Sequence, residues 1–177
     1  SVSAFLLNRS SDLSFVHTHY SINDGLARIK DLVEKAVKNG MPGMAITDHG
    51  NMFGIMEFYD VVNRLNKERT KNGEEPFKPI FGCELYVARR GDNRLKNSLK
   101  DLGGYHLIVL AKNYTGYKNL MKLVSNSWTD GYYNRLRTDH TELEKYYEGL
   151  IILSGCIAGE VPSKILKGDI IGAREAI

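Results

Sequence analysis

Imidazole, carboxylate and thiol side chains recur along the chain in a mixture that suits a metal site. The candidates are His17, His19, Asp24, His49, Glu84, His106 and Cys156. Such a mixture is typical of zinc, manganese or iron sites, whereas calcium prefers oxygen ligands alone. The spacing by itself is weak evidence, because ligands contributed one per strand leave no compact motif. The candidates therefore depend on the elements that would position them.

For some candidates, a purely structural role explains the residue as well as metal binding does. Asp24 and Gly25 are expected by default in a turn or at a helix N-cap. His106 comes at the start of its predicted strand, which is the wrong end for a barrel site, so the pattern alone favours a structural histidine. Cys156 follows a predicted strand and could be a small core residue, and Cys83 is expected in the core. His49 and Glu84 are the hardest to explain without a metal.

Short apolar runs alternate with segments of helical periodicity along the whole chain. Strands are predicted at 44–47, 79–88, 105–111 and 149–156, and helices at 26–37, 54–67, 114–127, 141–147 and 161–177. This repeated strand-helix-strand order predicts the α/β class with a largely parallel sheet or barrel. Functional side chains in such folds lie at the carboxyl ends of strands. His49 and Cys156 come at such ends.

The bulk composition is that of an ordinary globular domain. The chain has 177 residues, of which 42% are hydrophobic and 25% charged, so disordered and fibrous classes are excluded. A net charge of +3 is compatible with a nucleic-acid neighbour and does not require one. Two cysteines without CxxC spacing indicate neither a disulfide framework nor a zinc ribbon. A reduced, cytoplasmic setting is expected, with neither membrane span nor signal peptide.

The run RRGDNRLKNSLK at 89–100 has five basic residues, one acidic residue and no period, so an exposed loop is predicted. It could touch a nucleic-acid backbone, although such runs are more often solvated faces. Tyr132, Tyr133 and Arg135 could stack on unpaired bases, and packing explains them equally well. None of them is predicted as a site residue.

Five segments carry a resemblance to a known family: HTHYSINDG, AITDHGNMFG, KPIFGCELYVA, HLIVLAKNYTGYKNLMKLVS and EGLIILSGC. In this order they resemble the PHP (polymerase and histidinol phosphatase) domain found at the amino terminus of the bacterial replicative DNA polymerase III alpha subunit. The resemblance covers nearly all of 15–177. TDHGNMFG and GYKNLMKLVS match this polymerase branch rather than the free-standing phosphatases.

The resemblance implies a distorted (β/α)7 barrel of the TIM-like PHP type, truncated here at its C-terminal side. Residues 1–14 would be an extension, partly of cloning origin, 15–177 an incomplete PHP domain, and the polymerase domains would lie outside this chain. Up to three divalent ions, zinc or manganese, are implied. Their ligands in this chain would be His17, Asp24, His49, Glu84, His106 and Cys156. A further Asp-x-His pair would lie beyond Ile177.

One position departs from the family pattern. The usual HxHTxYS motif places its first histidine at 15, where this chain has Phe15. The following Thr-x-Tyr-Ser keeps the register, so His17 is the expected ligand and His19 a rim group. A cluster that lacks one early ligand and the late pair is expected to bind metal weakly or not at all.

Three functions follow from the resemblance. The module could be structural, and a docking surface for a proofreading exonuclease; it could be a metal-dependent 3′–5′ exonuclease; or the chain could be a free-standing phosphoesterase of the histidinol-phosphatase type. Phe15 favours the first over the second. The parent subunit would be a DNA-directed DNA polymerase that binds primer–template DNA, the sliding clamp, the clamp loader and the proofreading exonuclease, without a membrane.

Overall fold

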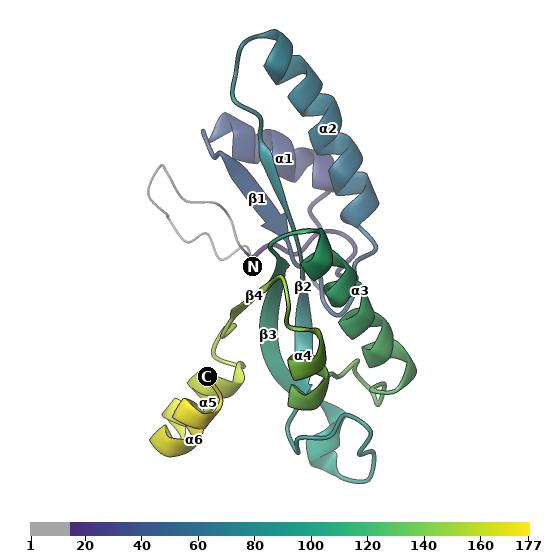
Figure 1. The fold of residues 1–177 in the computed structure, drawn as a ribbon, viewed down its shortest axis with the longest axis vertical. Helices are drawn as coiled ribbons and strands as arrows, with labels where there is room; N and C mark the ends of the chain where they lie inside the picture. Colours follow the sequence, from purple (N-terminus) through teal and green to yellow (C-terminus); the bar gives the residue numbers. More distant parts are fainter. Residues whose placement is uncertain (1–14) are drawn as a thin grey trace.

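The computed structural model describes residues 15–177, and the predicted extension at 1–14 lies outside the described residues. The chain is a mixed α/β protein, as predicted. Its helices are α1 (Ile29–Lys38), α2 (Ile55–Lys71), α3 (Tyr114–Thr129), α4 (His140–Tyr146), α5 (Glu160–Leu166) and α6 (Ile170–Glu175), with a 3-10 turn, η1, at Leu99–Leu102. Its strands are β1 (Gly43–Ile46), β2 (Lys78–Ala88), β3 (Gly104–Ala111) and β4 (Leu150–Leu153). In Figure 1, α1 and α2 lie beside β1, whereas α3 and α4 lie beside the other end of β2.

The four strands form one sheet in the order β1-β2-β3-β4. The long strand β2 pairs parallel with β1 through its first half and antiparallel with β3 through its second half. Strand β4 pairs antiparallel with β3. The prediction of a largely parallel sheet is therefore wrong, although the strands themselves lie close to their predicted positions.

The connections between the strands explain this difference. A parallel neighbour requires a crossover that carries the chain back to the starting end of the sheet. Between β2 and β3 the chain has only a loop with η1, so β3 starts beside the end of β2, with Gly104 opposite Ala88. Between β3 and β4 the two helices α3 and α4 bring the chain back to the end where β3 stopped, with Leu150 opposite Ala111.

The core consists of three adjoining clusters. One lies between α1, β1 and α2 and includes Val33, Met44 and Phe58. The second joins β2 and β3 to α3 and α4, and the third connects Ala45 of β1 to β3. Cys83 is fully buried in the second cluster, as predicted, and burial raises the pKa of its thiol. It is a core residue.

Two predicted helices differ from the observed ones. The first begins at Ile29 rather than 26, and Leu26 is 95% exposed. The segment predicted as one helix at 161–177 is broken into α5 and α6. Gly168 between them has a φ of +77°, a left-handed conformation that a continuing helix excludes. The Asp169 carboxylate then caps α6 by accepting a 2.9 Å hydrogen bond from the Gly172 N–H.

The basic run at 89–100 is a loop, as predicted, apart from η1, which starts at Leu99. A buried side chain anchors it: the Arg137 guanidinium donates hydrogen bonds to the carbonyl oxygens of Asn93 and Leu95, at 2.6 and 3.0 Å. The Asp139 carboxylate accepts a 3.0 Å hydrogen bond from the Asn93 N–H. Because buried polar groups are satisfied in this way, the loop is held in one place rather than merely solvated.

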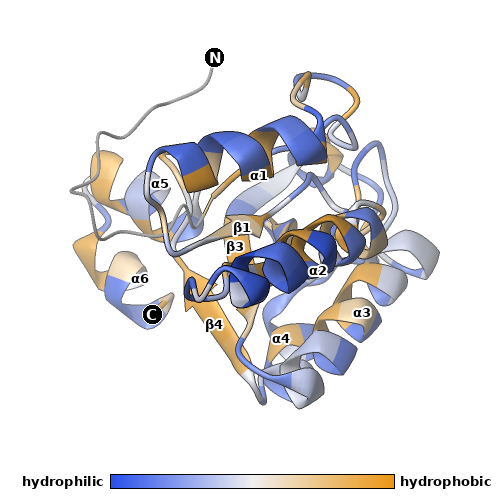
Figure 2. Cartoon of the chain, turned by 90° about the horizontal axis from the view of Figure 1, so that it is seen from above, coloured by the Kyte–Doolittle hydropathy of each residue, from blue (hydrophilic) through white to orange (hydrophobic). Residues whose placement is uncertain are grey.

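The edge strand β4 leaves apolar surface in solvent. Ile151 and Ile152 are each 45% exposed, and Ile171 on α6 is 75% exposed. Figure 2 shows β4 in the hydrophobic colour along its whole length. None of the helices among residues 15–177 has the length and apolarity to span a membrane.

Candidate metal centre

The carboxylate of Asp48, two residues after the end of β1, organises the segment that carries His17 and His19. It accepts hydrogen bonds from the Thr18 N–H at 2.7 Å, the Thr18 hydroxyl at 2.8 Å and the Ser21 hydroxyl at 2.7 Å. All three residues are buried. The same Ser21 hydroxyl accepts a 3.2 Å hydrogen bond from the His49 N–H. Asp48 thus fixes the 18–21 segment against the end of β1.

This anchoring places His17 over His49. The two imidazole rings are stacked, with centroids 3.9 Å apart. His17 Nδ1 is buried and has no hydrogen-bond partner among the described residues. Burial, followed by the nearby His49, lowers the pKa of His17 below its ordinary value. A neutral imidazole with an unsatisfied nitrogen is the form that binds metal ions.

Glu84 lies at the middle of the candidate site. It is 1% exposed on β2, and its Oε1 lies 2.8 Å from His106 Nδ1. Its Oε2 contacts His49 Nδ1, and His49 Nε2 lies 3.0 Å from Asp24 Oδ2. One buried carboxylate thereby connects groups from the 17–25 segment, the end of β1 and the start of β3. Asp24 itself lies in a turn, as its Asp-Gly pattern predicted, and still reaches the site.

The position of His106 follows from the direction of β3. Because β3 runs antiparallel to β2, its start lies beside the carboxyl end of β2, where His106 is opposite Tyr86. The pattern-based interpretation placed His106 at the wrong end because it assumed a parallel strand. The family-based expectation placed it near the other candidates, where the structure has it.

Cys156 reaches the same place through the turn after β4. Its Sγ lies 3.8 Å from His106 Nδ1, and the residue is exposed rather than part of the core. The preceding Gly155 has a φ of +75°, and a Cβ built there would lie 2.6 Å from the His106 carbonyl oxygen. Only glycine allows this close approach of the turn to β3.

All six predicted ligands therefore lie in one connected group. His17, His49 and Glu84 offer ligand atoms that all lie within 4.8 Å of one another. Ligand atoms around a single zinc ion lie about 3–4 Å apart. The three side chains would therefore need to move only slightly to bind one ion together. His19 is separate from them, with its Nε2 3.8 Å from Glu57 Oε2 on α2. The donor set of imidazoles, carboxylates and a thiol fits a zinc or manganese ion.

Tyr86 is a site residue that the sequence reading missed. Its hydroxyl lies 2.8 Å from His49 Nδ1 and 3.4 Å from Glu84 Oε2. The available signal was its spacing, because side chains two residues apart on a strand share a face. Burial, together with the Glu84 charge, raises the pKa of the phenol, so Tyr86 is a hydrogen-bond donor at neutral pH. Asp48 was also missed, although it precedes His49 at the end of a buried strand.

Glu84 and the neighbouring histidine His49 shift each other's pKa values. Burial alone would raise the pKa of Glu84, yet hydrogen bonds to His106 and His49 lower it to about 2. Burial lowers the pKa of His49, but hydrogen bonds to Glu84 and Asp24 outweigh it and raise the pKa above the ordinary value. Glu84 is thus ionised at neutral pH, and a metal ion has to compete with a proton for His49.

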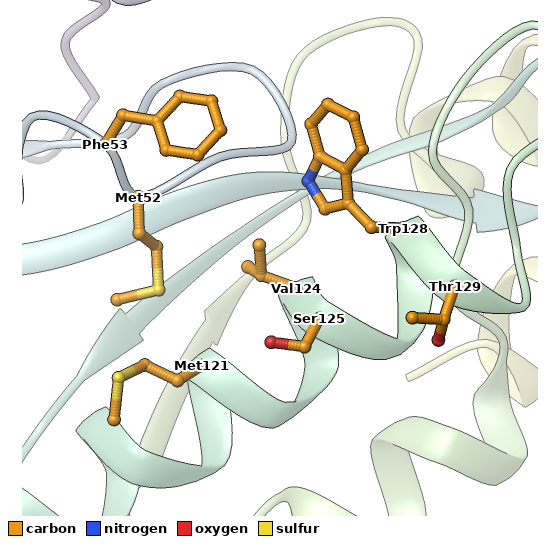
Figure 3. A pocket seen from close by; sticks show the side chains of 7 residues that line it. All are labelled: Met52, Phe53, Met121, Val124, Ser125, Trp128 and Thr129. Atoms are coloured by element: carbon orange, nitrogen blue, oxygen red, sulfur yellow. The ribbon is translucent and has the colours of Figure 1, made fainter.

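An apolar hollow of about 430 Å³ borders the loop that follows His49. Figure 3 shows Met52 and Phe53 of this loop facing Met121, Val124 and Trp128 of α3. The Trp128 indole N–H donates a 3.2 Å hydrogen bond to the Gly50 carbonyl oxygen and so ties α3 to the loop. The hollow contains none of the six candidate ligands. Its only polar side chains, apart from the Trp128 indole N–H, are the hydroxyls of Ser125 and Thr129.

Comparisons with known proteins identify the family of the chain. The model of the family described as PHP domain matches residues 15–177. DNA polymerase III subunit alpha of Borreliella burgdorferi is 46% identical over 164 residues, which are 92% of this chain and 13% of that protein. The subunits named likewise from Treponema pallidum and Thermus aquaticus are 44% and 40% identical, over 88% and 89% of this chain. The chain spans 13% of the length of each of these relatives.

A solved structure from Bifidobacterium adolescentis is described as a metal-dependent phosphoesterase. Its structural match covers 67% of this chain and 32% of the Bifidobacterium chain. Its TM-score is 0.39 at 17% identity. A similarity this low carries no argument about fold or metal. The family match and the polymerase relatives are the informative comparisons.

Proposed function

Because the chain belongs to the PHP domain family, we propose that it is the amino-terminal PHP module of a bacterial DNA polymerase III alpha subunit. The relatives of that name, at 40–46% identity over most of the chain, support this. The parent would be a cytoplasmic DNA-directed DNA polymerase whose nucleotidyl transfer belongs to other domains. Its partners would be primer–template DNA, the sliding clamp, the clamp loader and the proofreading exonuclease.

The four-stranded sheet would be part of a distorted (β/α)7 barrel, and 15–177 would belong to that one domain. The α/β architecture supports this, as does the gathering of candidate ligands beside the carboxyl ends of β1 and β2. In barrels of this kind the site lies at such strand ends.

We propose further that this module holds up to three divalent ions, zinc or manganese, through His17, Asp24, His49, Glu84, His106 and Cys156. The observation that carries this proposal is the position of Glu84, which contacts both His49 and His106 from a fully buried place on β2. Burying an ionised carboxylate is costly unless cations compensate it. In the metal-free chain the contacting histidines provide this compensation, and bound divalent ions would take it over from their protons.

The chemistry that fits this site is hydrolysis of a phosphodiester, as in trimming a DNA 3′ end. A bound divalent ion supplies positive charge to the phosphoryl oxygens and acidifies a water molecule. The protein's own part is to hold the ligands in place through Asp48 and to offer the Tyr86 hydroxyl as a donor. The buried Glu84 stays ionised and keeps His106 and His49 oriented.

A second candidate function is supported by Phe15. This side chain lies edge-on against the ring of His17, with centroids 4.7 Å apart, and provides no ligand atom. A cluster with this gap would bind metal poorly, and the module would then serve as a structural and docking part of the replicase. The two candidates differ in whether the chain binds metal.

The deciding experiment is a calorimetric titration of zinc and manganese into the metal-free chain. We expect saturable binding of at least one ion per chain, and at least tenfold weaker binding by His49→Ala, because a central ligand is lost. His140→Ala is the matched control: His140 is an exposed histidine that pairs with Glu160 outside the site. Its metal binding should equal that of the unchanged chain.

Absence of metal binding in the unchanged chain would contradict the hydrolytic proposal and favour the structural module. Where metal binds, the loaded chain is assayed on primer–template DNA with an unpaired 3′ end. Release of nucleotides that His49→Ala abolishes and His140→Ala preserves would support 3′–5′ exonuclease activity.

A further inference from the structure

Arg135 brings a positive charge to the edge of the candidate metal centre. It is exposed, and its guanidinium carbon lies 5.3 Å from the centroid of the Tyr86 ring. Tyr86 shares a strand face with Glu84, and its hydroxyl contacts both His49 and Glu84. The Tyr86 side chain therefore contacts both the guanidinium and two proposed ligands.

The backbone around Arg135 is fixed against β2. Thr138 pairs with this strand through hydrogen bonds of 2.8 Å to the Tyr86 carbonyl oxygen and from the Ala88 N–H. Asn134 has a φ of +62°, which forms the tight turn that pairs Tyr133 with Arg135. The Asn134 amide also donates a 3.1 Å hydrogen bond to the Leu102 carbonyl oxygen. These hydrogen bonds fix the backbone position of Arg135.

Within 15–177, no carboxylate lies within ion-pair distance of Arg135, whereas Arg69, Arg90 and Arg94 each pair with one. The carboxylates of the candidate metal centre, Asp24 and Glu84, are already engaged by histidines. An exposed, unpaired and well-positioned guanidinium beside such a site is suited to an anion, and its planar fork matches phosphate.

We propose that Arg135 binds the phosphate next to the one that occupies the metal-ligand cluster, so that the site accepts single-stranded polynucleotide ends rather than phosphomonoesters. This inference rests on the proposed function, since it assumes a phosphodiester at the cluster. The contact with Tyr86 carries it: the guanidinium lies against this side chain, whose hydroxyl contacts His49 and Glu84. Two anionic groups bound at once, one at the metal-ligand cluster and one at Arg135, are the repeating phosphates of a nucleic-acid strand.

The test is the binding of a short, fluorescently labelled DNA single strand to the 177-residue chain, followed by anisotropy across a range of salt concentrations. We expect Arg135→Ala to weaken binding about fivefold or more and to lower the salt slope by about 0.7, the value for one lost phosphate contact. Arg135→Gln keeps most of the side chain and should show the same loss. Circular dichroism confirms that both variants are folded.

Arg89→Ala is the matched control. Arg89 is also exposed and lies over a tyrosine ring, that of Tyr105, with its guanidinium carbon 5.5 Å from the ring centroid. Tyr105 precedes His106 on β3, so its side chain faces away from the site. Affinity and salt slope of Arg89→Ala should match those of the unchanged chain.

A competition experiment then separates substrate classes. A dinucleotide with an internal phosphodiester and a terminal phosphate should displace the labelled strand better from the unchanged chain than a mononucleotide does. Arg135→Gln should lose that preference. The inference is overturned by no detectable DNA binding, by Arg135→Gln binding as the unchanged chain does, or by equal losses in the Arg89 and Arg135 variants.

These readouts do not depend on hydrolysis. If the metal titration fails but Arg135→Gln still loses DNA affinity selectively, the proposed hydrolytic function is wrong and the polynucleotide contact of Arg135 stands. If metal binds but the DNA readouts are unchanged by Arg135→Gln, the metal centre stands and the contact is wrong.

Discussion

At the scale of single residues, one buried carboxylate and its supports determine the candidate site. Glu84 contacts His49 and His106 directly, while Asp48 fixes the segment that carries His17. The two carboxylates have different tasks: Glu84 faces the proposed metal, and Asp48 faces backbone and hydroxyl donors. Removing either should therefore have distinct consequences.

Asp48→Ala should destabilise the chain by about 3 kcal/mol, because it leaves the buried N–H and hydroxyl of Thr18 and the hydroxyl of Ser21 without an acceptor. Urea unfolding followed by circular dichroism measures the change. Asp60→Ala is the control, since Asp60 is exposed on α2 and its substitution should alter stability by less than about 0.5 kcal/mol. Equal stability of the two variants would contradict the role of Asp48.

The stability of the metal-free chain should depend on pH through Glu84. Its pKa is lowered from 4.5 to about 2, so its ionised form stabilises the fold above pH 4.5 and this contribution is lost as the pH falls toward 2. The loss amounts to at most about 3 kcal/mol. The raised pKa of His49 acts in the opposite sense: its contribution is complete below pH 6.5 and is lost as the pH rises through its folded value.

Urea unfolding at a series of pH values tests this dependence. Glu84→Gln should flatten the acidic limb of the profile. Asp60→Asn should leave that limb unchanged, because Asp60 is exposed on α2 and its carboxylate forms no ion pair or hydrogen bond with another side chain among residues 15–177. A Glu84→Gln profile parallel to that of the unchanged chain would show that Glu84 does not carry the effect.

At the scale of elements, strand direction and one turn bring the candidate ligands His106 and Cys156 to the site. The antiparallel strand β3 starts beside the end of β2, so His106 faces the group although it comes first on its strand. The turn after β4 then brings Cys156 to His106. This turn approaches β3 closely at Gly155, where a Cβ would lie 2.6 Å from the His106 carbonyl oxygen.

Gly155→Ala should cost at least about 1 kcal/mol more than Gly91→Ala. Both glycines have a positive φ, +75° and +78°, so the conformational cost of alanine is shared. Only at Gly155 would the new Cβ meet the backbone of His106, whereas at Gly91 no atom lies within 4 Å. Urea unfolding gives the stabilities, and zinc titration should show weaker binding for Gly155→Ala alone. Equal behaviour of the two variants would refute the importance of this contact.

At the scale of the whole molecule, the sheet has an apolar edge. β4 ends the strand order, with Ile151 and Ile152 half exposed, and Ile171 of α6 is exposed as well. Unpaired edge strands with apolar side chains promote association between chains. The isolated chain should therefore self-associate through this edge.

Light scattering after size-exclusion chromatography should show an average mass that increases with the concentration of the unchanged chain. Ile152→Lys should lower this association, because a lysine on an edge strand opposes pairing. Tyr59→Lys on α2 adds the same charge at a side chain of similar exposure, 46% against 45%, and should not lower it. A mass independent of concentration would contradict the prediction.

The sequence by itself determined the types of candidate ligand, the approximate positions of most helices and strands, and the family, because periodicity and motifs are local properties of the chain. It also indicated His49, which follows a predicted strand, and Glu84, which lies within one. The tertiary structure decided the rest. The direction of β3, set by the connections on either side of it, reversed the interpretation of His106, and Gly168 divided the last helix.

Asp48, Tyr86 and Arg135 acquire their proposed roles mainly from neighbours that are distant in the chain. Local signals, such as the spacing of Tyr86 from Glu84 and the tyrosines beside Arg135, do not suffice to assign those roles. The proposed metal centre and its phosphate contact are products of folding for this physical reason. Each depends on side chains from several elements that meet only when the sheet and the 17–25 segment come together.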